Sequence, residues 1–124
     1  MKKISFIIPC FNEEKNVLII YDKIKKIYQQ QNYEVEIVFI DDGSSDNTLY
    51  ELKQIKDSDK KISAKIISFS RNFGKDSAIY AGLKNSTGDY SVIIDADLQQ
   101  NPKLTLDMVE FLEKNKDYNC VCYY

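Results

Sequence analysis

The residues of this sequence best suited to chemistry are carboxylates, and two of them, Asp95 and Asp97, are separated by a single residue. Alternate side chains of an extended segment point to the same side, so both carboxylates can face one site. Gln99 adds a third side-chain oxygen at the same spacing. A few oxygen ligands suit Mg²⁺ or Mn²⁺, with water and phosphate oxygens completing the coordination. The triplet is equally compatible with a polar strand end that caps the next helix, and the pattern alone leaves both interpretations open.

A second acidic segment, residues 41–46, reads Asp-Asp-Gly-Ser-Ser-Asp. These residue types are typical of a turn that leads into a helix, which is the simpler interpretation. Two adjacent aspartates exceed what a turn needs, because one of Asp41 and Asp42 must then point inward or into a cleft. A carboxylate aimed into a cleft can accept a hydrogen bond from the N–H group of a nucleobase.

Basic residues occur in a third polar segment, which contains Arg71, Gly74 and Lys75. A glycine directly before a helix leaves backbone N–H groups free for an anion, and Lys75 would add charge there. Both basic residues also fit as ordinary surface charges. Cys10 follows the first apolar run, and without a neighbouring base it is better explained as a small packing residue than as a nucleophile.

Composition excludes several classes of function. The 124 residues carry 17 basic and 19 acidic side chains, a net charge of −2, which argues against a nucleic-acid partner. Histidine is absent, so Ser-His-Asp and Cys-His catalysis and imidazole-bound zinc are excluded. The odd set Cys10, Cys120 and Cys122 has no disulfide-framework spacing and favours a reducing, cytoplasmic setting. No apolar run approaches the ~18 residues that a spanning helix needs.

Short apolar runs alternate with longer amphipathic stretches along the chain. Strands are expected at residues 4–8, 35–40, 63–69, 90–94 and 120–124. Helices are expected from an N-cap at Asn12 to residue 28, over 49–55, over 75–83 and, after the start signal Asn101-Pro102, to residue 112. The predicted core faces include Tyr21 and Tyr28 in the first helix and Leu104, Met108, Phe111 and Leu112 in the last, and residues 56–61 are predicted to be a loop.

This alternation predicts an α/β fold with a mostly parallel sheet and helices on both faces, formed as a single domain over residues 1–124. In such sheets, ligands bind beyond the carboxyl ends of the strands. The polar segments 9–13, 41–46, 70–75 and 95–99 all fall there. The chain stops within an apparent strand, so we expect it to be the amino-terminal portion of a longer protein. Self-association through the exposed edge of that strand is also expected.

Taken together, four ordered motifs make the sequence recognisable. They are residues 7–14 (Ile-Ile-Pro-Cys-Phe-Asn-Glu-Glu), 38–48 (Val-Phe-Ile-Asp-Asp-Gly-Ser-Ser-Asp-Asn-Thr), 70–83 and 95–102. The chain resembles, over essentially its whole length, the family 2 glycosyltransferases of the GT-A fold. Residues 70–83 and 95–102 resemble the branch that transfers sugars to polyprenyl phosphate, as dolichol-phosphate-mannose synthase does. The resemblance implies the nucleotide-binding half of a Rossmann-like GT-A domain.

The resemblance also implies roles for individual residues. A UDP- or GDP-sugar would lie across the strand ends, with Pro9, Phe11 and Glu13 lining the nucleoside and Asp42 meeting the base. Asp95, Asp97 and Gln99 would hold the divalent cation, Mg²⁺ or Mn²⁺, on the diphosphate. Arg71 and Lys75 complete the expected donor-binding set. The cation stabilises the leaving nucleoside diphosphate while an acceptor oxygen attacks the anomeric carbon with inversion.

Other parts of the expected enzyme fall outside these 124 residues. Family members place acceptor recognition, and in many cases the catalytic base, in a second half, so the base is expected beyond Tyr124 and this chain alone is not expected to transfer sugar. The membrane-contacting helices of the branch also lie there, which implies a full-length protein at the cytoplasmic face of the membrane. Phe11 stands where the family usually has tyrosine, which removes a hydroxyl and keeps the stacking face. The nucleotide, the sugar and the acceptor, polyprenyl phosphate or a growing glycan, remain open.

Two other protein classes share this layering. A phosphorylation-dependent receiver module needs acidic residues after the first strand and a phosphoacceptor aspartate after the third. Here the corresponding segments are Pro-Cys-Phe-Asn-Glu and Ser-Arg-Asn. A nucleotidyltransferase usually carries a glycine-rich phosphate loop after the first strand, and residues 9–13 contain no glycine. Both alternatives therefore fit less well than a glycosyltransferase.

Overall fold

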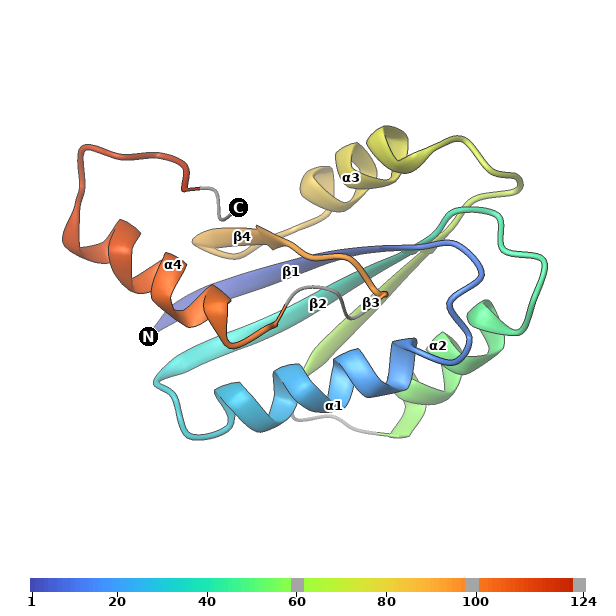
Figure 1. Cartoon of the computed structure of the whole chain (residues 1–124), viewed down its shortest axis with the longest axis horizontal. Coiled ribbons are helices and arrows are strands. Elements are labelled where there is room, and N and C mark those ends of the chain that lie inside the picture. The colour runs from blue at the N-terminus through green and yellow to red at the C-terminus, as the bar shows by residue number, and fades with distance from the viewer. Residues whose placement is uncertain (59–61, 98–100, 122–124) are drawn as a thin grey trace.

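Strands and helices alternate in the computed structural model, which describes residues 1–58, 62–97 and 101–121 (Figure 1). The strands are β1 (Lys2–Cys10), β2 (Tyr33–Asp41), β3 (Ser63–Ser68) and β4 (Tyr90–Ile93). The helices are α1 (Val17–Tyr28), α2 (Thr48–Ser58), α3 (Lys75–Lys84) and α4 (Leu104–Lys114). All strand pairs are parallel, and the four-stranded sheet has the order β3-β2-β1-β4. None of the described helices is long and apolar enough to cross a membrane.

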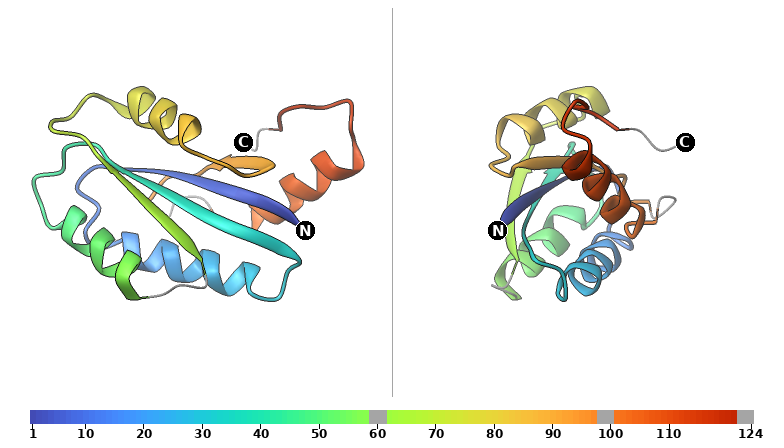
Figure 2. Two further views of the ribbon diagram at one scale, coloured as in Figure 1. Left: turned by 180° about the vertical axis from the view of Figure 1, so that it is seen from behind. Right: turned by 90° about the vertical axis from the view of Figure 1, so that its left-hand side faces the viewer.

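Helices cover both faces of this sheet, as Figures 1 and 2 show, with α1 and α2 on one side and α3 on the other. Successive side chains of β1 point to opposite faces of the sheet, so this strand contributes to the core on both faces. Phe6 and Ile8 belong to the larger core cluster, which includes residues of α1, α2 and α4, whereas Ile7 packs in a smaller cluster with Ala78 of α3. The predicted α/β architecture is therefore confirmed. Tyr21 and Tyr28 are also buried, as the helical spacing predicts.

The start of α1 differs from the prediction. The helix begins at Val17, with Asn16 at the N-cap position, rather than after Asn12. Asn12 has a φ of 53° and uses its side-chain oxygen to accept the backbone N–H groups of Ser45 and Asp46. Its capping chemistry therefore serves the loop after β2 instead of its own helix.

The carboxyl-terminal elements also differ from the prediction. Helix α4 buries Thr105 and Val109 rather than the predicted face, because the Thr105 hydroxyl pairs with the buried hydroxyl of Tyr28 at 2.6 Å. Phe111 is instead 40% exposed. Residues 120 and 121 are not in a strand and Cys120 is exposed, so the predicted fifth strand is wrong at these positions, while residues 122–124 lie outside the described part. The predicted loop at 56–61 is helical through Ser58, and residues 59–61 are likewise outside the described part.

A buried carboxylate in the amino-terminal half of β2 fixes the turn that leads into β4. Glu36 of β2 accepts hydrogen bonds from the Ser5 hydroxyl at 2.6 Å and from the Thr87 backbone N–H at 2.9 Å. Its side chain is 1% exposed and forms ion pairs with Lys65 at 2.8 Å and Lys3 at 3.9 Å. Burial alone would raise the pKa of Glu36, but the hydrogen bonds from Lys65, Ser5 and Thr87 and the charge of Lys3 outweigh it and lower the pKa to about 2.

This cluster predicts a specific acid sensitivity. Because the pKa of Glu36 is lower in the folded chain than its ordinary value of 4.5, its stabilisation is complete above about pH 4.5 and is lost as the pH falls toward about 2. Glu36→Gln should lower the free energy of unfolding near neutral pH, on the order of 2 kcal/mol, and flatten its pH dependence in that window. Urea unfolding between pH 2 and 7 measures this. Glu34→Gln, at an exposed position on the same strand, is the control, and equal acid slopes in wild type and Glu36→Gln would contradict the prediction.

Candidate functional site

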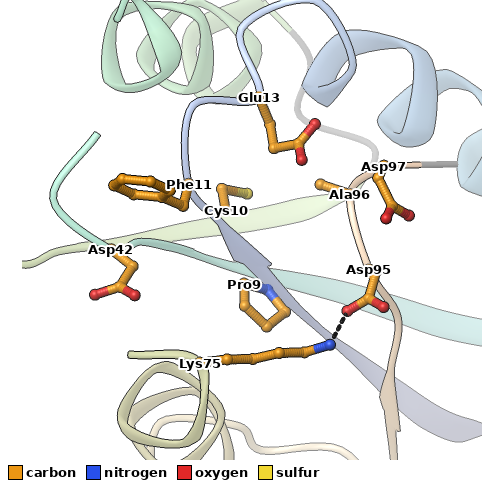
Figure 3. A pocket seen from close by; sticks show the side chains of 9 residues that line it. All are labelled: Pro9, Cys10, Phe11, Glu13, Asp42, Lys75, Asp95, Ala96 and Asp97. Atoms are coloured by element: carbon orange, nitrogen blue, oxygen red, sulfur yellow. Dashed lines mark ion pairs between the residues drawn. The ribbon is translucent and has the colours of Figure 1, made fainter. Parts of the chain in front are cut away.

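A pocket lies at the carboxyl ends of β1, β2 and β4 and beside the first turn of α3 (Figure 3). Its lining consists of Pro9, Cys10, Phe11, Glu13, Asp42, Lys75, Asp95, Ala96 and Asp97. The structure thus brings together all the predicted donor-site residues except Arg71, and Gln99 lies outside the described residues. Parallel strands place their carboxyl ends at one edge, which is why segments far apart in the sequence meet here.

The pocket has two sides of different chemistry. Figure 3 shows Phe11 and Asp42 together on one side and Asp95 and Asp97 on the other. Phe11 is 48% exposed, so its ring face is available to a planar group. The carboxylate of Glu13 points into the space between the two sides.

Hydrogen bonds between the loops after β1 and β2 place Phe11 and Glu13. The backbone N–H of Asn12 donates to the Ser44 hydroxyl, and that of Glu13 donates to the Thr48 hydroxyl, both at 2.9 Å. Sequence reasoning did not assign Asn12 and Thr48 any part in the site. The one available signal was the asparagine itself, since Asn tolerates the left-handed conformation better than most residues.

The two adjacent aspartates have separate tasks. Asp41 accepts the backbone N–H of Ser44, which is ordinary turn chemistry. Asp42 is buried, and its two carboxylate oxygens accept the backbone N–H groups of Phe73 and Gly74 at 2.8 and 3.1 Å. The N–H of Gly74 is therefore occupied by the carboxylate of Asp42, while anion binding by the following N–H groups at the start of α3 stays a prediction.

Arg71 lies outside the pocket lining. Its guanidinium carbon stands 4.4 Å from the ring centroid of Phe73, a cation–π contact, and Phe73 packs edge-on against Phe69 at 5.6 Å. In this arrangement Arg71 supports the loop before α3. A direct role for Arg71 in donor binding stays a prediction.

Lys75 and Asp95 form an ion pair across the pocket, with 2.6 Å between the Lys75 Nζ and an Asp95 carboxylate oxygen (Figure 3). Within the described ranges, no group of three or more His, Cys, Asp or Glu side chains is placed to hold a metal ion. Asp95 and Asp97 nevertheless both line the pocket. Mg²⁺ is commonly held by one or two carboxylates together with phosphate oxygens and water, so this pair fits Mg²⁺ or Mn²⁺ in combination with a phosphate ligand.

Cys10 is not a nucleophile in this arrangement. Its thiol is 1% exposed and donates to the carbonyl of Ile8. Burial, with smaller contributions from the charges of Asp41 and Glu13, raises the pKa of Cys10 and keeps the thiol protonated at neutral pH. The packing interpretation of this residue is therefore supported.

Known proteins match this chain over nearly its whole length. The sequence model described as "Glycosyl transferase family 2" matches residues 5–124. A protein of Shigella phage SfX described as "Bactoprenol glucosyl transferase" is 40% identical over 115 residues, which cover 93% of this chain and 37% of that protein. The chain spans about a third of the length of the curated relatives it matches.

Solved structures share the fold. A mannosyltransferase from Pyrobaculum calidifontis, described in complex with GDP-Man and Mn²⁺, matches with a TM-score of 0.73 and 26% identity over 90% of this chain and 32% of that one. The S. aureus protein TarS, residues 1–349, in complex with UDP-GlcNAc also matches with a TM-score of 0.73. Its 24% identity covers 94% of this chain and 32% of that one, and this likeness shows the fold alone. The predicted GT-A-like arrangement is thus confirmed for the described part of the chain.

Proposed function

The chain belongs to the family 2 glycosyltransferases, and we propose that residues 1–124 form the donor-binding domain of an enzyme that transfers a sugar from a nucleoside diphosphate to polyprenyl phosphate. The observation that carries this proposal is the two-sided pocket, with Phe11 and Asp42 on one side and Asp95 and Asp97 on the other. A nucleotide-sugar has the same two chemistries, a planar base at one end and a charged diphosphate near the other. Family membership sets aside the receiver and nucleotidyltransferase alternatives.

The donor would lie with its base toward Phe11 and its diphosphate toward Asp95 and Asp97. Phe11 offers a ring face for the nucleoside, beside Pro9 and Glu13 of the same loop. Each oxygen of the Asp42 carboxylate accepts one backbone N–H and keeps a further lone pair, so Asp42 can hold its loop and accept a base N–H together.

A divalent cation, Mg²⁺ or Mn²⁺, is proposed at Asp95 and Asp97, with Gln99 as a further ligand implied by the family resemblance. When bound, the cation would neutralise charge that develops on the departing diphosphate. The two aspartates would hold the diphosphate through this cation. Carboxylates and phosphates carry like charges and repel one another unless a cation lies between them. The Mn²⁺ described with the Pyrobaculum mannosyltransferase supports this assignment.

The proposed transfer is a single displacement. An oxygen of the acceptor phosphate attacks the anomeric carbon, the bond from that carbon to the diphosphate oxygen breaks, and the configuration inverts. The name of the phage relative favours polyprenyl phosphate over a growing glycan as the acceptor. Because the relatives are about three times as long, we assign acceptor binding, the catalytic base and membrane contact at the cytoplasmic face to the additional length.

Nucleotide binding tests the proposal, with Asp42→Ala as the informative variant. UDP or GDP should bind the wild-type chain in Mn²⁺ by calorimetry. Asp42→Ala should weaken that binding about tenfold or more, because it removes a charged hydrogen-bond acceptor for the base together with the carboxylate that holds residues 73 and 74. The loss should be similar in Mn²⁺ and in EDTA, since the proposed partner is not the metal.

Asp76→Ala is the matched control, because Asp76 is exposed in the first turn of α3 and does not line the pocket. A loss for Asp42→Ala that appears only in the presence of metal would sink the base-contact assignment. Failure of both UDP and GDP to bind the wild-type chain with metal would overturn the proposed function itself.

A further inference from the structure

The pocket holds an excess of negative charge that one lysine partly balances. Four carboxylates, those of Glu13, Asp42, Asp95 and Asp97, line it. Lys75 contributes the one ammonium group among the lining residues that the structure describes. Its Nζ lies 2.6 Å from a carboxylate oxygen of Asp95, and Asp95 belongs to the pair of carboxylates that fits a divalent cation. A cation bound there and the Lys75 ammonium group would therefore compete for the same negative charge.

The backbone directly before Lys75 is held in place, whereas the Lys75 side chain is exposed and can move away from Asp95. Lys75 is the first residue of α3, and the two preceding N–H groups are held by the buried carboxylate of Asp42. The Lys75 side chain is 57% exposed and that of Asp95 is 34% exposed. Exposed ion pairs of this kind shift an equilibrium by less than about fivefold, so a divalent cation can displace the lysine at small cost.

We propose that Lys75 is the resting counterion of Asp95 and moves to the donor's diphosphate when a divalent cation takes its place. This inference rests on the proposed function. One divalent cation neutralises the charges of Asp95 and Asp97, which leaves the Lys75 ammonium group without its partner. A diphosphate bound to that cation lies within the same pocket and offers the lysine a new anionic partner. The exchange makes the site ready for a cation and a diphosphate together.

Mn²⁺ binding without nucleotide tests the first half of this exchange. Free Mn²⁺, followed by its electron paramagnetic resonance signal, should show about two- to fivefold tighter binding to Lys75→Met than to the wild type, because the competing positive charge is gone. Lys75→Arg keeps that charge and should bind Mn²⁺ like the wild type. Lys84→Met, at the exposed far end of the same helix, is the control for a general loss of charge.

Titration with UDP or GDP at saturating Mn²⁺ tests the second half. Lys75→Met should bind the nucleoside diphosphate about tenfold more weakly than the wild type, whereas Lys84→Met should not differ. Unchanged or weaker Mn²⁺ binding by Lys75→Met would overturn the exchange, and so would unchanged nucleotide binding. If the wild-type chain binds nucleotide with metal while either of these results appears, only the exchange fails. If it binds no nucleotide at all, the proposed function fails.

Discussion

Asp97→Asn is expected to remove the metal-dependent part of nucleotide binding while leaving the fold intact. Asp97 is exposed on the pocket wall, so the substitution changes little of the buried core. Asparagine keeps the shape of the side chain but lacks the negative charge that a hard divalent cation needs. Changes to groups that merely support metal ligands commonly cost about 10- to 100-fold in affinity, so loss of a ligand should reach at least the upper end of that range.

Calorimetry with UDP or GDP, in Mn²⁺ and in EDTA, measures this effect. The Asp97→Asn chain in Mn²⁺ should bind no better than the wild type in EDTA. Asp107→Asn, at an exposed position in α4 away from the pocket, is the matched control and should keep the full response to metal. A normal gain in affinity from Mn²⁺ in the Asp97→Asn chain would show that the cation is held elsewhere.

Gly43→Ala is expected to destabilise the fold and disturb the site together. Gly43 has a φ of 71°, and a Cβ atom there would lie 2.3 Å from the carbonyl carbon of Arg71 and 2.4 Å from the backbone nitrogen of Asn72. The backbone at Gly43 and the backbone at residues 71 and 72 would have to move apart. Residues 71 and 72 directly precede the segment that positions Lys75, so the pocket would be disturbed as well. The cost of a positive φ for alanine and the cost of the steric overlap together should lower the free energy of unfolding, measured in urea, by about 2–4 kcal/mol.

Gly74→Ala separates the two contributions. Gly74 also has a positive φ, of 104°, but a Cβ atom there would meet nothing within 4 Å. With a ψ of 159°, Gly74 has a conformation that is essentially restricted to glycine, so Gly74→Ala should lose only the conformational part, about 1–3 kcal/mol. Equal losses for the two variants would mean that the close approach of Gly43 to residues 71 and 72 is unimportant.

The strand ends are predictable because they depend on local pattern. Apolar runs followed by polar segments locate the ends of β1, β2 and β4 within two residues, and parallel strands share one edge. Those two facts suffice to bring Phe11, Asp42, Asp95 and Asp97 to the same edge of the sheet, where the pocket lies. The order of short motifs along the chain therefore predicts most of the site residues.

Other features depend on partners distant in the sequence. Asn12 looks like a cap for its own helix, yet it serves a loop more than 30 residues away. Thr105 rather than Leu104 faces the core because a hydroxyl on α1, 77 residues distant, needs a partner. Likewise, the pairing of Lys75 with Asp95 requires α3 and the end of β4 to lie side by side, which no local spacing reports. Sequence periodicity describes one helix or strand at a time. These contacts connect two separate segments of the chain, so periodicity does not predict them.

The most direct measurement of the central claim is the position of Mn²⁺ in crystals of this chain grown with Mn²⁺ and UDP or GDP. Anomalous scattering identifies the metal independently of the nucleotide. A peak between the carboxylates of Asp95 and Asp97, with the nucleotide base beside Phe11 and Asp42, is the predicted result. A nucleotide bound outside this pocket, or a Mn²⁺ peak away from Asp95 and Asp97, would contradict the proposal that this edge of the sheet binds a nucleotide-sugar.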